Sequence, residues 1–276
     1  MSGIVLGALD LHSTEASGVQ WILSDLKGWG APGGTLAPQQ KPRSPGAWAG
    51  NSYAKACPLV LTGTCIAPSA ALASLALDRL IDAASLDDTR MDVSEGGRSR
   101  WSAVRRDGDV LPEWMGDTAF SYSIQVVALD PRKLGAPITA STRLPSSTGG
   151  LTIPYTIPYT INSTQVTGQA SIFNPGNETG PVTMRIDGPV TGPVVTHIGS
   201  GLRLVFAASM TLGVGEWIDI DMEAHTVLAQ GTTTRAQYVT SRQWSGLESG
   251  QNTGSFTAAT YSPGALITVT GTPADK

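Results

Sequence analysis

The clearest periodic pattern in the first half of the chain is helical and covers residues 69–85. A helix brings four polar side chains together on one stripe: Ser74, Asp78, Asp82 and Ser85. Apolar side chains fill the remaining wide arc: Leu72, Leu75, Leu77, Leu80 and Ile81. Ser69 follows a proline and is a suitable N-cap. The pattern therefore predicts one amphipathic helix.

Extended segments are predicted on both sides of this helix. The run ACPLVLTGT ahead of it is typical of a strand, and so is AFSYSIQVVALD behind it. In the second run Phe120, Tyr122, Ile124 and Val126 alternate with other residues, which predicts one buried face. Between them, Asp107-Gly108 separates two extended runs, a pattern that favours a hairpin turn.

The second half shows no helical period, but many short extended runs separated by Gly, Pro and Asn. These runs are LTIPYTIPYTI, GQASIFN, PVTMRIDG, PVVTHIG, LRLVFAAS, WIDIDME, TVLAQ, GSFTAAT and ALITVTG. Such a series predicts a sandwich of antiparallel sheets. The prolines of the tandem TIPY-TIPY at 152–159 exclude a central strand there. The fold expected for the whole chain is mainly β, with one helix in an N-terminal α+β domain.

Charge density falls near the middle of the chain, which indicates two domains. Residues 1–135 carry 12 basic and 14 acidic side chains, whereas residues 136–276 carry 6 and 8. The segment around this change is rich in Ser, Thr, Pro and Gly, as connecting segments are. The sequence predicts an N-terminal domain over 1–135, a linker over 136–150 and a C-terminal β-sandwich domain over 151–276.

Composition excludes several classes of protein. Hydrophobic residues make up 41% and the mean hydropathy is 0.00, which disfavours disorder. The net charge of −4 disfavours sequence-independent binding to nucleic acid. No uncharged apolar stretch reaches the roughly 18 residues of a membrane helix, and no secretory signal is readable at the N-terminus. We therefore expect that the chain is synthesised in a cytoplasm and does not associate with a membrane.

Residues suited to catalysis or metal binding lack a supporting pattern. Cys57 and Cys65 would lie about 26 Å apart on one straight strand, too far for a disulfide. The three histidines, His12, His197 and His225, show no metal-ligand spacing. A row of acids on one face of the WIDIDME strand, formed by Asp219, Asp221 and Glu223, could bind Ca²⁺ or serve acid–base chemistry, but a solvated face is favoured. We expect no enzyme activity, no metal and no cofactor.

Tryptophans near Gly and Pro are the candidate contact residues. Trp29 lies in LKGWGAPGG and Trp48 in SPGAWAGN, where a loop could present an aromatic anchor to another protein. Packing beneath the loop, inside their own domain, is the alternative. Arg105 and Arg106 are expected at the tip of the predicted hairpin, where they would either contact a partner or be solvated.

Several segments together resemble the distal tail protein of long-tailed bacteriophages, in particular the minor tail proteins of actinobacterial siphophages. The segments of the first half are WILSDLKGWGAP, PRSPGAW, PLVLTGT with the helix after it, VRRDG and FSYSIQVVALDPRKLG. Those of the second half are GGLTIPYTIPYTI, SIFNPGNETGPVTMRIDGPVTGPVV, GLRLVFAASMTLGVGEWIDIDM and WSGLESGQNTGSF. The resemblance covers nearly the whole chain.

This resemblance implies a structural part of the virion, located at the tail tip. Six copies would form a ring through their N-terminal domains, with a galectin-like C-terminal sandwich directed outward. The ring would join the tail tube protein to the baseplate hub and let genomic DNA pass without binding it, which the net charge of −4 suits. The competing hypothesis is a carbohydrate-binding sandwich that contributes to host adhesion, for which Trp217 and Trp244 are the aromatic candidates.

Overall fold

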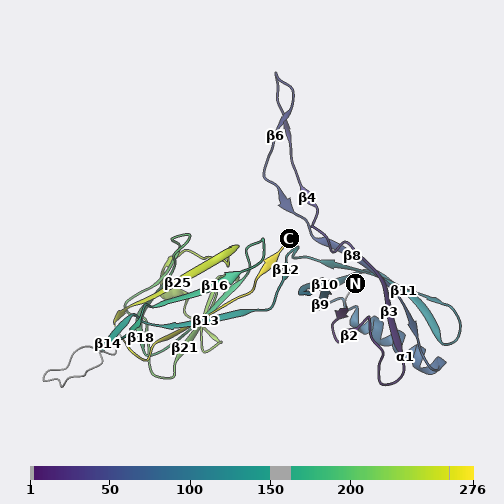
Figure 1. Cartoon of the computed structure of the whole chain (residues 1–276). Coiled ribbons are helices and arrows are strands. Elements are labelled where there is room, and N and C mark those ends of the chain that lie inside the picture. Colours follow the sequence, from purple (N-terminus) through teal and green to yellow (C-terminus); the bar gives the residue numbers. More distant parts are fainter. Residues whose placement is uncertain (1–2, 150–162, 261) are drawn as a thin grey trace, which may run out of the picture. The chain divides into compact units, whose positions relative to one another are not determined.

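The computed structural model describes residues 3–149, 163–260 and 262–276. Its contacts divide the chain into two units, residues 1–135 with Lys276 and residues 136–275. Each unit has a hydrophobic core of its own. The described part is mainly β with a single α-helix, which confirms the predicted composition of secondary structure (Figure 1).

One antiparallel sheet forms most of the first unit. Its strands follow the order β2 (Leu9–Asp10), β1 (Ile4–Leu6), β9 (Thr89–Glu95), β10 (Arg98–Trp114), β11 (Ala119–Ala128), β8 (Cys57–Ile66) and β3 (Gln20–Lys27), and β12 (Lys133–Leu134) pairs with β10. Strands β8 and β11 are central and alternate between core and surface along their length. The core side of β11 contains Phe120, Tyr122, Ile124 and Val126, as the sequence predicts, and also Ala128.

Helix α1 (Ala70–Ala83) begins at the predicted N-cap, because the Ser69 hydroxyl accepts a hydrogen bond from the Leu72 amide. Its buried face is narrower than expected and consists of Ala73, Ala76 and Leu80. Two residues of the expected apolar arc, Leu75 and Ile81, are 55% and 43% exposed. The helix packs against β2, β8 and β11, and small side chains at the contact allow a close approach. Leu72 and Leu77 are half-buried against the core, so the helix is amphipathic as predicted, and the face that it buries is narrower than its apolar arc.

The predicted hairpin turn at Asp107-Gly108 is wrong, because this pair lies inside strand β10. The strand continues through this pair, because both of its halves bind the same neighbour: Arg106 lies opposite Val126 and Val110 opposite Ile124 in β11. The residues between them form a bulge, in which Gly108 adopts a φ of +106° that only glycine favours. A two-residue turn would have required the two halves to pair with each other instead of with β11.

The second unit is built from two sheets with a shared core. The first sheet follows the order β13 (Ile138–Arg143), β26 (Leu266–Gly271), β17 (Val182–Asp187), β21 (Trp217–Asp221), β22 (Thr226–Ala229) and β23 (Thr233–Thr234). The second follows the order β16 (Gln169–Asn174), β25 (Gly250–Thr260), β18 (Val190–His197), β19 (Arg203–Phe206) and β24 (Val239–Arg242), and β20 (Thr211–Leu212) pairs with β18. A short 3₁₀ helix (Ala236–Tyr238) precedes β24, and β27 (Ala274–Asp275) ends the unit. Side chains from both sheets, such as Ile186 and Phe256, meet in one core, which is the arrangement of a sandwich.

The predicted linker differs from the structure. Strand β13 pairs along its whole length with β26 and so belongs to the sandwich. Strand β14 (Ser146–Gly149) follows it and pairs with β15 (Ser163–Val166). Ser and Thr suit the exposed edge strand of a sheet as well as a linker, so composition alone does not separate the two. The TIPY-TIPY segment at 152–159 lies outside the described residues.

Candidate subunit interface

A long exposed arm, residues 30–56, connects β3 to β8 and projects from the first unit (Figure 1). Near its base β4 (Gly34–Thr35) pairs with β7 (Tyr53–Ala54), and nearer its tip β5 (Gln39–Gln40) pairs with β6 (Ala47–Trp48). Every residue of the arm is exposed except Pro32 and Lys41, which are half-buried. A two-stranded ribbon of this kind is marginally stable in water unless it packs against something.

Large apolar side chains stand on this arm without cover. Leu36 is 57% exposed, Trp48 55% and Tyr53 67%. Local hydrogen bonds hold the ribbon together, among them one from the Lys55 amide to the Gly33 carbonyl oxygen at 2.7 Å. Trp48 therefore occupies the exposed position of the first of the two interpretations, whereas its contact with a neighbouring subunit stays a prediction.

The arm is also basic. Its charged residues are Lys41, Arg43 and Lys55, and it contains no acidic residue. The first two lie in the tip, residues 41–46, which joins β5 to β6 and contains two prolines. The tip thus combines positive charge, a neighbouring tryptophan and a backbone of restricted freedom.

Trp29, just before the arm, is buried instead of exposed. Its side chain is 8% exposed and belongs to the core of the first unit. The Lys133 ammonium lies 5.5 Å from the centre of its ring, and it donates hydrogen bonds to the carbonyl oxygens of Gly30 at 2.6 Å and Lys276 at 2.8 Å. This position corresponds to the alternative interpretation, in which the tryptophan packs on its own domain.

Arg105 and Arg106 lie within β10 and not at a hairpin tip. The Arg105 guanidinium binds the Asp88 carboxylate at 2.5 and 3.0 Å, and this hydrogen-bonded pairing lowers the pKa of Asp88. Both partners are exposed, so the pair contributes little to stability. The Arg106 backbone amide donates to the Ser85 carbonyl oxygen at 2.9 Å. The side-chain Nε of Arg106 is buried without a hydrogen-bond partner. Contacts of either arginine with another subunit stay a prediction.

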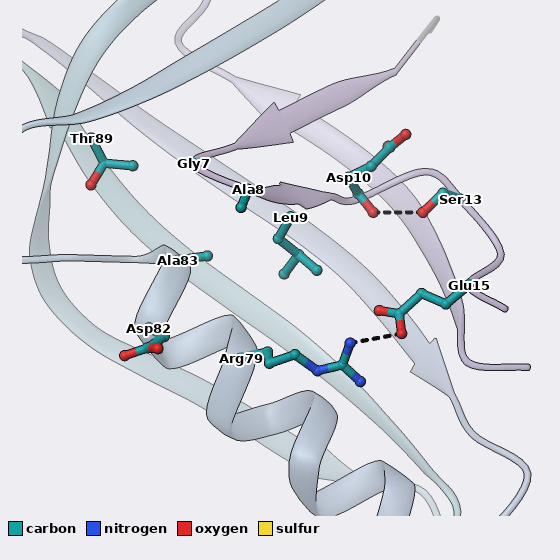
Figure 2. A pocket seen from close by; sticks show the side chains of 10 residues that line it. All are labelled: Gly7, Ala8, Leu9, Asp10, Ser13, Glu15, Arg79, Asp82, Ala83 and Thr89. Atoms are coloured by element: carbon teal, nitrogen blue, oxygen red, sulfur yellow. Dashed lines mark hydrogen bonds and ion pairs between the residues drawn. The ribbon is translucent and has the colours of Figure 1, made fainter. Parts of the chain in front are cut away.

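A cleft of about 590 Å³ lies between the β1–β2 turn and helix α1 (Figure 2). We call it the acidic cleft, because three carboxylates and one guanidinium line it: Asp10, Glu15, Asp82 and Arg79. Its other lining residues are small or apolar: Gly7, Ala8, Leu9, Ser13, Ala83 and Thr89. Sequence analysis did not identify this cleft, because its two walls are more than 60 residues apart in the chain.

Glu15 is fully engaged inside the cleft. Its carboxylate accepts hydrogen bonds from Trp21 Nε1 at 2.9 Å, Arg79 Nη1 at 2.7 Å and the Ser17 hydroxyl at 3.0 Å. Partial burial acts to raise the pKa of Glu15, but these hydrogen bonds together outweigh it and lower the pKa. Glu15 and Arg79 therefore neutralise each other, and Asp10 and Asp82 supply the remaining negative charge.

In the second unit, both aromatic candidates for saccharide binding are covered on one face. The Arg185 guanidinium carbon lies 4.3 Å from the centre of the Trp217 ring, and Trp217 Nε1 donates to Asp219 at 3.1 Å. The His225 and Trp244 rings stack with their centres 4.8 Å apart. A saccharide platform needs an open aromatic face, and these contacts use one face of each ring.

The other candidate groups have structural partners. Ile218 and Ile220 of β21 are buried, so Asp219 and Asp221 share the opposite face, as predicted. Asp221 accepts hydrogen bonds from the backbone amides of Glu223 and Ala224 at 2.9 and 2.8 Å and so fixes the turn after β21.

The histidines and cysteines also lie in structural surroundings. His197 binds Ser200 through Nδ1 at 2.7 Å and the buried Asn252 through Nε2 at 3.2 Å. Cys57 and Cys65 lie at opposite ends of β8 as free thiols, which confirms that they do not pair. Among the described residues, no group of three His, Cys, Asp or Glu side chains could hold a metal ion. No helix in this part of the chain is long and apolar enough to cross a membrane.

Comparison with known proteins gives matches at the level of structure alone. No family model and no curated protein matches the sequence. The crystal structure of the Dit protein of phage SPP1, described as a paradigm of the hub adsorption apparatus in phages that infect Gram-positive bacteria, is similar over 98% of this chain and 98% of that chain. Its TM-score is 0.65 at 13% sequence identity. The chain has a fold similar to that of SPP1 Dit.

Structures of the phage P2 baseplate in its activated conformation are similar as well. The form with Ca has a TM-score of 0.51 at 13% identity over 92% of this chain and 90% of that chain. The form with Sr has a TM-score of 0.51 at 14% identity over 97% of this chain and 96% of that chain. At such identities the likeness to SPP1 Dit and to these baseplate chains is one of fold.

Within this Dit-like fold, sequence reasoning located one of the two surface features described above. The Gly- and Pro-rich composition around Trp48 indicated an exposed loop, but not the length of the arm. The absence of acidic residues between Asp25 and Asp78 was the available signal for a basic arm. No comparable signal marks the acidic cleft.

Proposed function

We propose that the chain is a structural subunit of the tail tip of a long-tailed phage, of the actinobacteriophage type. Six copies form a ring that joins the tail tube protein to the baseplate hub, and genomic DNA passes through the ring. The observation that carries this proposal is the likeness to SPP1 Dit, which extends over both units of the chain. A match of that extent includes the order of the two units as well as the fold of each.

The exposed arm supports self-assembly on physical grounds. Three of its large apolar side chains, Leu36, Trp48 and Tyr53, are more than half exposed, and apolar surface left open in this way is available for contact with a partner. A contact between two different patches of identical subunits closes into a ring when the rotation per subunit divides a full turn. In this proposal the first unit forms the ring and the second is a galectin-like sandwich directed outward.

The proposed role is structural and requires no catalysis, cofactor or metal. The acids of β21, His197 and Glu15, which are the groups best suited to chemistry, each hold local structure through hydrogen bonds. The net charge of −4 suits a conduit, since a strongly basic lumen would retain DNA. The subunit would be made in the host cytoplasm and act in the virion.

The carbohydrate-binding alternative is not the function that we propose. Trp217 and Trp244 are its aromatic candidates, and each already stacks on a side chain of its own unit. A fold can host many functions, but no other described residue of the second unit favours saccharide binding over assembly.

Native mass spectrometry of the purified chain and cryo-electron microscopy of assembled tails test the proposal together. Six copies of a 28.6 kDa chain weigh about 172 kDa, the mass expected for a closed ring. The tail images should show the same six copies between tube and hub. A ring of another order, or a single copy per tail, would contradict the proposal.

A further inference from the structure

We propose that the tip of the arm of one copy docks into the acidic cleft of the next copy. The inference rests on the proposed ring and names the two surfaces that hold it together. One surface is the tip with Lys41 and Arg43, together with Trp48 beside it, and the other is the cleft with Asp10 and Asp82.

Charge complementarity is the first argument. The arm carries three basic and no acidic residues, whereas the rest of the first unit, residues 1–29 and 57–135, carries 9 basic and 14 acidic. Two copies therefore repel each other through most of this unit and attract where an arm meets an acidic surface. Complementary charges of this kind steer association and fix the register of the contact.

The cleft offers charges that its own unit does not neutralise. Arg79 is occupied by Glu15 at 2.7 Å. Asp82, an exposed residue of α1, forms no ion pair among the residues that the structure describes. Among the described residues, the Asp10 carboxylate accepts one hydrogen bond, from the His12 backbone amide at 2.9 Å. Asp10, on β2, and Asp82, on α1, lie at different ends of the cleft (Figure 2), and each carboxylate has acceptor capacity left for one incoming cation.

The size and the floor of the cleft suit the tip. A volume of about 590 Å³ falls in the range of sites that enclose a few side chains. Leu9 and Ala83 supply apolar surface beside the carboxylates (Figure 2), against which Trp48 can pack. Pro42 and Pro45 restrict the tip before it binds, which lowers the entropy lost on docking.

The arm leaves its own copy on the side away from the cleft (Figure 1). Strand β3 begins beside the cleft, where the Trp21 amide donates to the Ser13 carbonyl oxygen at 2.8 Å. The arm leaves the other end of β3, after Lys27, about 20 Å away at ~3.3 Å per residue. It then projects away from α1 (Figure 1). Donor and acceptor therefore lie at opposite ends of one unit, the arrangement that a head-to-tail ring requires.

Charge exchange between the two surfaces tests the contact in the full-length chain. The variants are Arg43→Glu in the arm, Asp82→Lys in the cleft, and both together. Asp78→Lys is the matched control, because Asp78 is exposed one turn earlier on α1 and does not line the cleft. Asp82→Asn removes the charge with almost no change of size. Native mass spectrometry over a dilution series gives the concentration at which half of the copies are assembled, and thermal unfolding verifies that each variant folds.

Each single exchange should raise the half-assembly concentration about tenfold, and the double exchange should restore it to within about threefold of the original. Asp82→Asn should have a smaller effect in the same direction, and Asp78→Lys none. If Arg43→Glu or Asp82→Lys leaves the half-assembly concentration unchanged, or if the double exchange does not restore it, the docking contact is wrong. The proposed ring would be unaffected by that result. A chain that is monomeric at every concentration and in tails would overturn both, and closed rings of another order would contradict only the proposed function.

Discussion

Replacing Trp48 by alanine separates a role in assembly from a role in folding. Trp48 is 55% exposed on the arm, whereas Trp29 at the base of the arm is 8% exposed in the core. The two tryptophans lie in similar Gly- and Pro-rich sequence, so Trp29→Ala is a matched comparison. The expected results for the two variants are opposite.

The magnitude for Trp48 follows from its exposed area. A tryptophan can bury about 250 Å², so at 55% exposure roughly 140 Å² of Trp48 is open to a partner. At about 25 cal/mol per Å², covering this area contributes about 3 kcal/mol to each subunit contact. Its loss would weaken each contact roughly 150-fold. The folded subunit itself should change by less than about 0.5 kcal/mol, because the side chain packs on nothing in its own core.

Trp29→Ala should behave in the opposite way. Removal of a buried tryptophan costs about 3–5 kcal/mol of unfolding free energy, so this variant should unfold at a clearly lower temperature before assembly is affected directly. Chemical unfolding followed by fluorescence gives the stability of both variants. Native mass spectrometry over a dilution series gives their assembly.

The result that would refute the reasoning is specific. If Trp48→Ala assembles at the same concentration as the unmodified chain, the arm does not bury its tryptophan in a subunit contact. If it lowers the unfolding free energy as much as Trp29→Ala does, the exposed position of the arm is wrong.

Three further predictions concern folding and the two units. Tyr122→Phe should raise stability by about 1 kcal/mol in chemical unfolding, because the Tyr122 hydroxyl is buried without a hydrogen-bond partner; a loss of stability would show that the hydroxyl is satisfied. Burial raises the pKa of Cys65 to about 11, so iodoacetamide should not label this thiol in the folded chain at pH 8. For the same reason the unfolding free energy should fall between about pH 9, where the unfolded thiol ionises, and pH 11; labelling at pH 8 would contradict the burial. A fragment over residues 136–275 should fold alone, whereas one that begins at Gly149 lacks β13 and should unfold at a lower temperature, as circular dichroism can measure; equal stability would exclude a structural role for β13.

The features that sequence reasoning predicted are those set by neighbouring residues. The helix begins at Ser69 because a hydroxyl in that position satisfies an amide three residues later. Strands β11 and β21 follow from alternation, since a period of two assigns each residue to the core or to the surface. Such patterns hold wherever one face of an element is buried.

The features that it missed depend on distant partners. Asp107-Gly108 has the composition of a hairpin turn, but β11 pairs with the chain on both sides of it and converts the turn into a bulge. Trp29 follows a glycine and still enters the core, where Lys133 from another part of the chain reaches its ring. The acidic cleft joins Asp10 to Asp82 through the packing of α1 on β2. No local pattern contains that information.

The exposed arm also determines what happens to a copy that finds no neighbour. Proteases cleave exposed, extended segments most readily, and trypsin would cut the arm after Arg43 or Lys55, since Pro42 protects the bond after Lys41. A cut at Arg43 leaves β3 and β8 paired on either side, so the nicked subunit would keep its core and lose its tip. Any contact that covers the arm protects these bonds. In the proposed ring, proteases would thus nick the arms of free copies and spare those whose arms a neighbouring copy covers.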